Sequence, residues 1–249
     1  MPLVTTEAII LQAFPYSDTS KILRLLTRTH GVRSAIARGA LRPRSRYGGV
    51  LEPFTKGTAT FYLKDGRDLH TLSGFELIRP RQELGRDLLR FGAASLLAEI
   101  LIRTASEESD PSLYAHVDQA LGLLADSPEE AVQGVALARL WALVGQLGFT
   151  PALDDCLVCG RVVGPDEDVF FDYAAGGVHC GDCGGGDAGR VVPAAARRTL
   201  LAYCAGEPVE PGDGAAAHWQ LLTRFLGYHL ADLGSLRSLR FLADAMDEA

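Results

Sequence analysis

Two pairs of cysteines have the spacing of a metal site. Cys156 and Cys159 form one Cys-x-x-Cys pair, and Cys180 and Cys183 form a second. Each pair bends the chain so that both sulfurs face one point, and two pairs at this separation supply the four thiolates of a tetrahedral zinc ion. Because four cysteine ligands leave no open coordination position, the sequence predicts a structural zinc rather than a catalytic one.

The residues around the cysteines leave alternatives open. The intervening segment VFFDYAAGGVHC predicts a hairpin that turns at Gly176–Gly177. Disulfide bonds and a partly bound site compete with four-cysteine zinc, although a cytoplasmic chain would keep its thiols reduced. A redox dithiol would need one such pair on a βαβ unit. His179 could replace a neighbouring cysteine as a ligand.

A second group of chemically capable residues lies in a basic stretch from Thr19 to Leu51, which contains no acidic residue. Its basic residues are Lys21, Arg24, Arg28, Arg33, Arg38, Arg42, Arg44 and Arg46. The guanidinium group of arginine matches phosphate oxygens two at a time. Arg42, Arg44 and Arg46 alternate with other residues, so in an extended loop they would point one way. The stretch predicts a phosphate-binding surface, with a solvated basic edge as the alternative.

The charge distribution separates this basic stretch from the rest of the chain. The whole sequence has 24 Lys+Arg against 31 Asp+Glu, a net charge of −7. Residues 1–80 hold 12 basic and 6 acidic residues, which gives +6, whereas residues 81–249 hold 12 and 25, which gives −13. This asymmetry indicates a basic binding module carried on an acidic body.

The pattern of residues 1–80 predicts a small β-barrel. Strand-like segments lie at residues 3–15, 20–29, 31–37, 54–63 and 69–78. The pair Asp65–Gly66 is a hairpin signal between the last two segments. Five short strands joined by turns suit a closed barrel of the oligonucleotide-binding (OB) type, although another small barrel is compatible with the spacing.

After Pro80 the apolar residues repeat at helical spacing. We therefore predict an α+β multidomain protein: a five-stranded OB-type barrel at 1–80, a helical domain at 81–150 and 190–249, and a four-cysteine zinc finger inserted at 151–189. The first long helix is expected to carry Leu84, Leu88 and Phe91 on one apolar face. Such faces most simply form a bundle core, and a cofactor or peptide groove is the alternative.

No apolar run approaches the roughly 18 residues that a membrane span needs. The start MPLVTTEAII has no basic segment of the kind that opens a signal peptide, so a cytoplasmic protein is the expectation. There is no Walker-type phosphate loop, no His-Glu-x-x-His zinc motif and no convincing pair of nucleophile and base, so we expect no enzyme. The alternatives are a metal-dependent nuclease and a zinc-ribbon accessory protein of transcription or translation that binds RNA.

A nucleic-acid reading assigns roles to particular side chains. The predicted phosphate contacts are Arg38, Arg42, Arg44 and Arg46, with Lys21, Lys56 and Arg67 as flanking candidates. The possible stacking platforms for unpaired bases are Tyr47, Phe54, Phe61 and Tyr62, although some of them must belong to the barrel core. Strand alternation places Phe61 and Tyr62 on opposite sides, so at most one of the two can stack.

Four segments together resemble the RecO family of bacterial DNA repair and recombination mediators. They are ARGALRPRSRYGGVLEPF from Ala37, LGFTPALDDCLVCG from Leu147, FFDYAAGGVHCGDC from Phe170 and YHLADLGSLRSLRFL from Tyr228. The segments are spread over nearly the full length and keep the order found in the family. The match is therefore more specific than a single motif.

The resemblance implies an N-terminal OB barrel, a helical body and an inserted zinc finger. It also implies binding to single- and double-stranded DNA, annealing of complementary strands and a nucleoid-associated location. The implied partners are RecR, the single-strand DNA-binding protein and the RecA pathway. The acidic tail of the single-strand DNA-binding protein would need cations, and the available ones are Arg197, Arg198, Arg224, Arg237 and Arg240.

Overall fold

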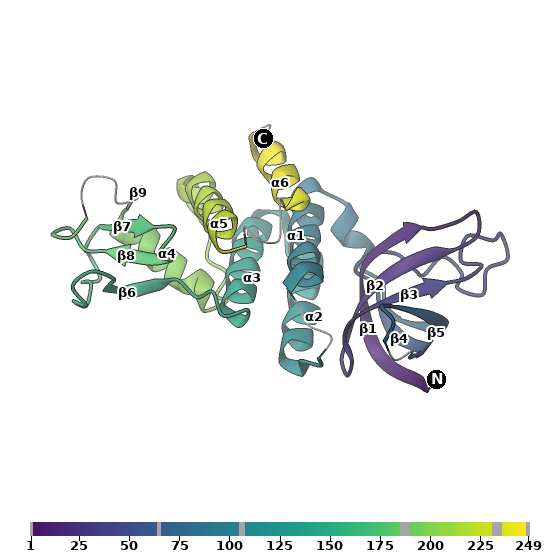
Figure 1. Cartoon of the computed structure of the whole chain (residues 1–249). Helices are drawn as coiled ribbons and strands as arrows, with labels where there is room; N and C mark the ends of the chain where they lie inside the picture. The colour runs from purple at the N-terminus through teal and green to yellow at the C-terminus, as the bar shows by residue number, and fades with distance from the viewer. Residues whose placement is uncertain (1, 64–65, 105–107, 185–189, 231–235, 248–249) are drawn as a thin grey trace. The chain divides into compact units, whose positions relative to one another are not determined.

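The computed structural model describes residues 2–63, 66–104, 108–184, 190–230 and 236–247. The chain divides into two compact units, Met1–Asp126 and Ser127–Ala249, which are considered separately (Figure 1). The first unit holds five strands and two long helices, and the second holds the cysteines, a small sheet and the remaining helices. The division into a barrel domain at 1–80, a helical domain at 81–150 and 190–249 and a zinc-finger insertion at 151–189 stays a prediction.

The five N-terminal strands form an OB-like barrel. They are β1 (Leu3–Pro15), β2 (Lys21–Thr27), β3 (Gly31–Ala37), β4 (Lys56–Tyr62) and β5 (Leu69–Arg79). They pair in the order β1-β2-β3-β5-β4, and β4 returns to pair with β1. All pairings are antiparallel except β3 with β5, which is parallel and runs only from Ser34–Leu69 to Ile36–Thr71. The predicted five-stranded fold is confirmed.

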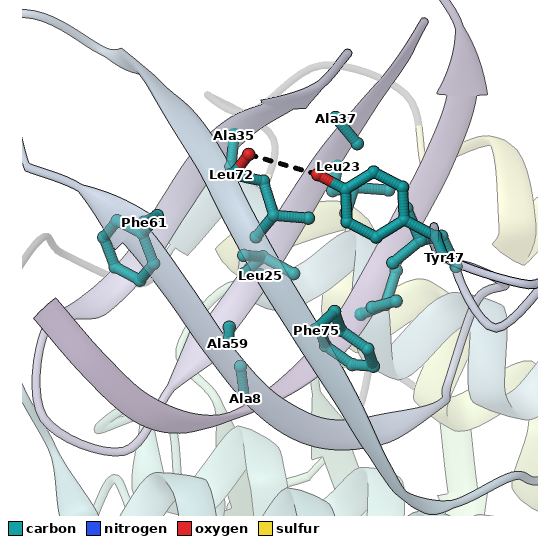
Figure 2. Close-up of a cluster of buried hydrophobic side chains, with 12 residues drawn as sticks. Ala8, Leu23, Leu25, Ala35, Ala37, Tyr47, Ala59, Phe61, Leu72 and Phe75 are labelled. Atoms are coloured by element: carbon teal, nitrogen blue, oxygen red, sulfur yellow. Dashed lines mark hydrogen bonds between the residues drawn. The ribbon is translucent and has the colours of Figure 1, made fainter. Parts of the chain in front are cut away.

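The barrel interior is filled by residues that alternate along the strands, as a closed sheet requires. Its largest members are Tyr47, Phe61 and Phe75, which pack with leucines such as Leu25 and Leu72 and with several alanines (Figure 2). Tyr47 comes from the β3–β4 loop and lies at one end of this cluster, where its hydroxyl donates to the Leu72 carbonyl at 3.1 Å (Figure 2). The loop therefore helps to close the barrel.

These burials correct the predicted stacking platforms. Tyr47, Phe54 and Phe61 are 4%, 5% and 0% exposed, so the expectation that they stack on bases is wrong. Tyr47 and Phe61 belong to the barrel core and Phe54 packs against the ring of Phe91, so the apolar area of all three contributes more here than on the surface. Tyr62 is exposed while its neighbour Phe61 is buried, which confirms that the two face opposite sides.

Two helices complete the first unit: α1 (Leu88–Thr104) and α2 (Pro111–Asp126). The expectation that Leu84 shares a helix face with Leu88 and Phe91 is wrong, because Leu84 lies in a separate short 3-10 helix, Gln82–Gly85. The side chain of Asp87 accepts a hydrogen bond from the Arg90 backbone N–H at 2.8 Å and thereby caps α1 at this point. Leu88 and Phe91 are exposed.

A buried arginine attaches α2 to the barrel. Arg81 follows β5, and its guanidinium pairs with the Asp118 carboxylate of α2 and donates to the Phe54 carbonyl at 2.9 Å. Lys56 of β4 pairs with the same carboxylate at 2.7 Å. Arg79 forms a second, exposed pair with Asp126. These contacts join α2 to the barrel, and both belong to the first compact unit.

The second unit combines helices with a four-stranded sheet. The helices are α3 (Val132–Gln146), α4 (Ala194–Cys204), α5 (Ala215–His229) and α6 (Arg237–Asp247). The strands β6 (Ala152–Cys156), β7 (Val169–Asp172), β8 (Gly177–His179) and β9 (Arg190–Val192) are arranged in the order β6-β8-β7-β9. The sheet thus extends to Val192. The predicted hairpin is confirmed, because β7 pairs with β8 in antiparallel register.

Aromatic residues form the core between the sheet and the helices of the second unit. The ring of Phe225 in α5 lies 5.1 Å from that of Trp141 in α3 and 6.2 Å from that of Phe171 in β7, measured between centroids. All three side chains are buried.

Among the described residues of the whole chain, no helix is long and apolar enough to cross a membrane.

Candidate nucleic-acid interface and metal centre

The arginine-rich loop between β3 and β4 is a chain of tight turns. Successive backbone hydrogen bonds run from Arg42 N–H to the Gly39 carbonyl at 3.2 Å, from Ser45 to Arg42 at 3.0 Å and from Gly48 to Ser45 at 3.2 Å. The expectation of an extended loop, with Arg42, Arg44 and Arg46 on one side, is therefore wrong. Gly39, Gly48 and Gly49 take positive φ angles, which permit the reversals.

Three contacts hold this loop on the barrel. Near its start, the Leu41 N–H donates to the Thr19 carbonyl in the β1–β2 turn at 3.0 Å. In its middle, the Tyr47 hydroxyl is bonded to β5 as described above. Near its end, the Lys21 ammonium donates to the Leu51 carbonyl at 3.1 Å. The loop is thus positioned by the barrel before any ligand arrives.

The fixed loop presents arginines to solvent. Arg38, Arg42 and Arg44 are exposed, and within the part of the chain that the structure describes their side chains make no hydrogen bond or ion pair. The Arg46 guanidinium is also exposed but donates to the Tyr47 hydroxyl at 2.9 Å. The structure therefore brings three unpaired guanidinium groups and one anchored group onto one loop.

The two predicted lysines occupy a different environment. The side chain of Lys21 is 16% exposed and pairs with Glu52 at 2.8 Å. The side chain of Lys56 is 18% exposed and pairs with both Asp118 and Glu7. Both ammonium groups are neutralised by carboxylates within the first unit. Their contact with nucleic acid stays a prediction.

A pocket of about 570 Å³ lies beside the arginine loop. It is lined by Tyr16, Ile36, Arg38, Gly66, Arg67, Asp68, Leu69 and Thr71. These residues come from the β1–β2 turn, the end of β3, the β4–β5 loop and β5, which are the parts of an OB fold that hold oligonucleotides. Lys64 and Asp65, part of the predicted hairpin signal, lie outside the described residues. Predicted contacts Arg38 and Arg67 meet here.

The sequence prediction gave no role to Tyr16, which lies between the first two strand segments. The ring is 58% exposed although the barrel has an apolar interior in which tyrosine could be buried. An exposed aromatic residue in the β1–β2 turn of a predicted OB barrel is the signal that could have identified it.

The four cysteines converge in the second unit. The sulfurs of Cys156, Cys159, Cys180 and Cys183 all lie within 4.8 Å of one another. The sulfurs of Cys159 and Cys180 are 3.9 Å apart, nearly twice a disulfide bond length, and all four thiols are free. Zn–S bonds of about 2.3 Å give a tetrahedron with edges of about 3.8 Å. The donor set and its spacing fit such an ion.

The backbone of the two cysteine turns favours thiolates. Hydrogen bonds from the backbone N–H groups of Cys159 and Cys180 lower the pKa of Cys156 to about 6. Burial alone would raise the pKa of Cys180, but hydrogen bonds from Arg161 and from the Cys183 backbone outweigh it and lower that pKa. Interaction with the neighbouring sulfurs of Cys180 and Cys159 raises the pKa of Cys183 to about 12. Thiolates this close repel one another, and the raised pKa of Cys183 is the result; a cation held among the four sulfurs would remove this penalty.

Side chains beyond the cysteines hold the module in shape. Arg161 makes two hydrogen bonds to the Glu167 carboxylate, at 2.9 and 2.6 Å, and they lower the pKa of Glu167 to about 2. At Gly184 a Cβ would lie 1.9 Å from the Phe170 ring, so only glycine fits after the last cysteine. The local sequence thus specifies the turns as well as the ligands.

The arginines suggested for binding an acidic tail differ in accessibility. Arg197 of α4 is 3% exposed and donates to the carbonyls of Leu153, Val163 and Gly164, so its proposed role as a tail contact is wrong. It instead joins α4 to the small sheet. Arg198 is exposed and pairs with Asp166 at 3.0 Å.

Two family models together match almost the entire chain. The model for the N-terminal part of recombination protein O matches residues 1–81, and the model for its C-terminal part matches residues 85–240. The chain belongs to the RecO family. The first match covers the barrel, and the second covers the helices and the cysteine module.

Proteins named DNA repair protein RecO confirm this relationship over nearly the full length. The one from Streptomyces griseus is 31% identical, and the alignment covers 97% of this chain and 99% of the relative. The one from Anaeromyxobacter dehalogenans strain 2CP-C is 34% identical over 97% and 96%, and that from Anaeromyxobacter sp. strain K is 35% identical over the same shares. The resemblance inferred from the sequence is confirmed.

Proposed function

We propose that this RecO-family chain is a DNA repair and recombination mediator that binds DNA through its barrel and anneals complementary strands. Arg38, Arg42 and Arg44 contact phosphates of the backbone, Arg67 contacts them from the β4–β5 loop, and Arg46 does so while holding Tyr47. The observation that carries this proposal is the fixed loop with three exposed, unpaired guanidinium groups beside the OB pocket.

Arginine contacts to phosphate explain binding without sequence preference, because the backbone is the same in every strand. Neutralised phosphates also let two complementary strands approach, and base pairing then supplies the free energy for annealing. No nucleotide hydrolysis is needed, so the function requires no enzyme activity. In this proposal Lys21 stabilises the arginine loop and Lys56 stabilises the contact with α2, and neither lysine contacts DNA.

The experiment measures anisotropy of labelled single-stranded DNA at several salt concentrations for the native chain and an Arg38/Arg42/Arg44→Ala variant. Each lost phosphate contact lowers the log–log salt slope by about 0.7, so three contacts lower it by about 2. The control is Arg28→Ala/Arg86→Ala, which removes two exposed arginines of the first unit whose paired carboxylate oxygens lie 3.7 and 3.8 Å away. An equal loss of binding free energy per arginine removed would mean that only net charge matters and would contradict a defined site.

We assign the cysteine cluster to one structural zinc ion. The four donors fit it, and such an ion stabilises a small module by fixing the turns that carry its ligands. Residues 151–190 hold eight acidic residues against two arginines, a net charge of −6, so this module would repel DNA. DNA contacts are therefore assigned to the first unit.

The acidic second unit is proposed as the surface for protein partners of recombination, namely RecR, the single-strand DNA-binding protein and the RecA pathway, in the cytoplasm at the nucleoid. The candidates for binding an acidic tail are Arg198, Arg224, Arg237 and Arg240.

The RNA-binding alternative is tested by competition between DNA and RNA strands of one sequence, and the nuclease alternative by fragment release with divalent metal. Tighter RNA binding or release of fragments would overturn the mediator proposal.

A further inference from the structure

We infer that the pocket beside the arginine loop holds an unpaired nucleotide, with its base stacked on Tyr16, and that this pocket gives the chain a single-strand preference that the arginine loop alone lacks. The inference rests on the proposed DNA-binding function and adds the form of the ligand at that site. The pocket volume of about 570 Å³ lies in the range of small-ligand sites.

The composition of the pocket matches the parts of a nucleotide. Tyr16 supplies an exposed ring, and the partly buried side chains of Ile36 and Leu69 supply an apolar wall. Arg38 and Arg67 are exposed cations at the same site. A base needs a flat apolar surface and its phosphate needs a guanidinium group, and both are present within one pocket.

The one carboxylate among the lining residues gives the bound base a direction. Asp68 would repel a phosphate but can accept hydrogen bonds from the amino group of a base. A nucleotide therefore enters with its phosphate toward Arg38 or Arg67 and its base edge toward Asp68. The charged residues among the described lining residues are Arg38, Arg67 and Asp68, which give a net charge of +1, and this charge favours an anionic nucleotide.

The position of Tyr16 also connects the pocket to the arginine loop. Thr19, three residues after Tyr16, accepts the Leu41 backbone hydrogen bond that anchors the loop. In the proposed arrangement, a strand that places one base on Tyr16 continues toward the loop that carries Arg42 and Arg44. In duplex DNA the base faces are covered by stacking within the helix, so a duplex can use the arginines but not the tyrosine.

The experiment compares Tyr16→Ala with Tyr228→Ala, a matched control in the second unit whose tyrosine is 60% exposed, close to the 58% of Tyr16, and does not line the pocket. For Tyr16→Ala we expect about a tenfold loss of affinity for a short single strand and less than a twofold change for duplex, because one stacked base is lost. The salt slope should stay at the native value. Tyr16→Trp should retain single-strand affinity.

A second readout uses a short strand with a single 2-aminopurine, whose fluorescence is quenched when the base stacks. The native chain should quench it and Tyr16→Ala should not. The inference is overturned if Tyr16→Ala behaves like Tyr228→Ala on single strands, or if Tyr16→Ala weakens duplex binding as much as single-strand binding. If the Arg38/Arg42/Arg44→Ala variant also binds normally, the proposed site itself has failed, so the two failures are distinguishable.

Discussion

The contact between Arg81 and Asp118 provides a quantitative test of how the first unit is held together. The Arg81 side chain is 1% exposed and the Asp118 side chain is 25% exposed. Burial lowers the pKa of Arg81, yet the guanidinium stays charged at neutral pH. Asp118→Asn would leave that charge buried without its carboxylate, which typically costs 3–5 kcal/mol. The Phe54 and Asp118 carbonyls still accept from Arg81, so we expect about 3 kcal/mol.

The control is the exposed ion pair between the same two elements. The side chains of Arg79 and Asp126 are 42% and 65% exposed, so Asp126→Asn should cost less than about 1 kcal/mol. Urea unfolding followed by far-UV circular dichroism reports both units, whereas fluorescence of the two tryptophans, Trp141 and Trp219, reports only the second unit.

A loss of about 3 kcal/mol lowers the urea midpoint of the first unit by about 1–3 M, because unfolding slopes of small domains are about 1–3 kcal/mol per M. The tryptophan transition should not move in either variant. The reasoning is refuted if Asp118→Asn shifts the dichroism midpoint no more than Asp126→Asn does.

The same pair predicts a pH dependence with a definite sign. Burial alone would raise the pKa of Asp118, but hydrogen bonds from Lys56 and Arg81 outweigh it, so the folded pKa lies below the unfolded value of 3.8. The unfolded chain then binds more protons, and the stabilising contribution is fully present above pH 3.8 and is lost as the pH falls through the folded pKa. The difference between native and Asp118→Asn midpoints should be constant from pH 5 to 7 and shrink in stronger acid.

Two further predictions concern close packing and the metal. Gly57→Ala should destabilise the barrel by about 2 kcal/mol, because the added Cβ would lie 2.4 Å from the Phe75 ring. Gly74→Ala should not destabilise it, because the nearest atom lies 4.0 Å from the added Cβ. Thermal unfolding followed by circular dichroism compares the two variants. Removing metal with a chelator, or Cys156→Ser, should abolish bound zinc and lower the tryptophan unfolding midpoint while DNA affinity is retained. Cys204→Ser, which changes a cysteine outside the cluster, should retain the zinc. If metal removal also abolished DNA binding, that result would contradict a DNA site on the barrel.

The barrel and the cysteine cluster were predictable because their signals are local. Alternation along β4 places Ala59 and Phe61 inside and Tyr62 outside, as a two-residue repeat requires. The Cys-x-x-Cys spacing likewise determines the turn that brings two sulfurs together. Neither prediction needed knowledge of residues far away in the chain.

The conformation of the arginine loop was not predictable in the same way. Its turns are held by contacts with distant segments, such as Leu41 with Thr19, so alternation within the loop says little about direction. The role of Lys56 was equally hidden, because its partner Asp118 is 62 residues away. Tyr47 appeared suitable for stacking since its contact with Leu72 across the barrel could not be read from neighbouring residues.

The arginines discussed above fall into two groups. They differ in solvent exposure and in whether carbonyl or carboxylate oxygens accept their hydrogen bonds. Arg81 and Arg197 are 3% exposed and donate to several backbone carbonyls each, so they join segments of the fold and their guanidinium groups are closed to an external ligand. Arg42 and Arg44 lie in a stretch without acidic residues and on a loop whose backbone is already satisfied by its own turns, so their donors stay available. Since a guanidinium with five donors binds phosphate as well as carboxylate, Arg42 and Arg44, which make no ion pair with any described residue, are the arginines that we propose for an external phosphate.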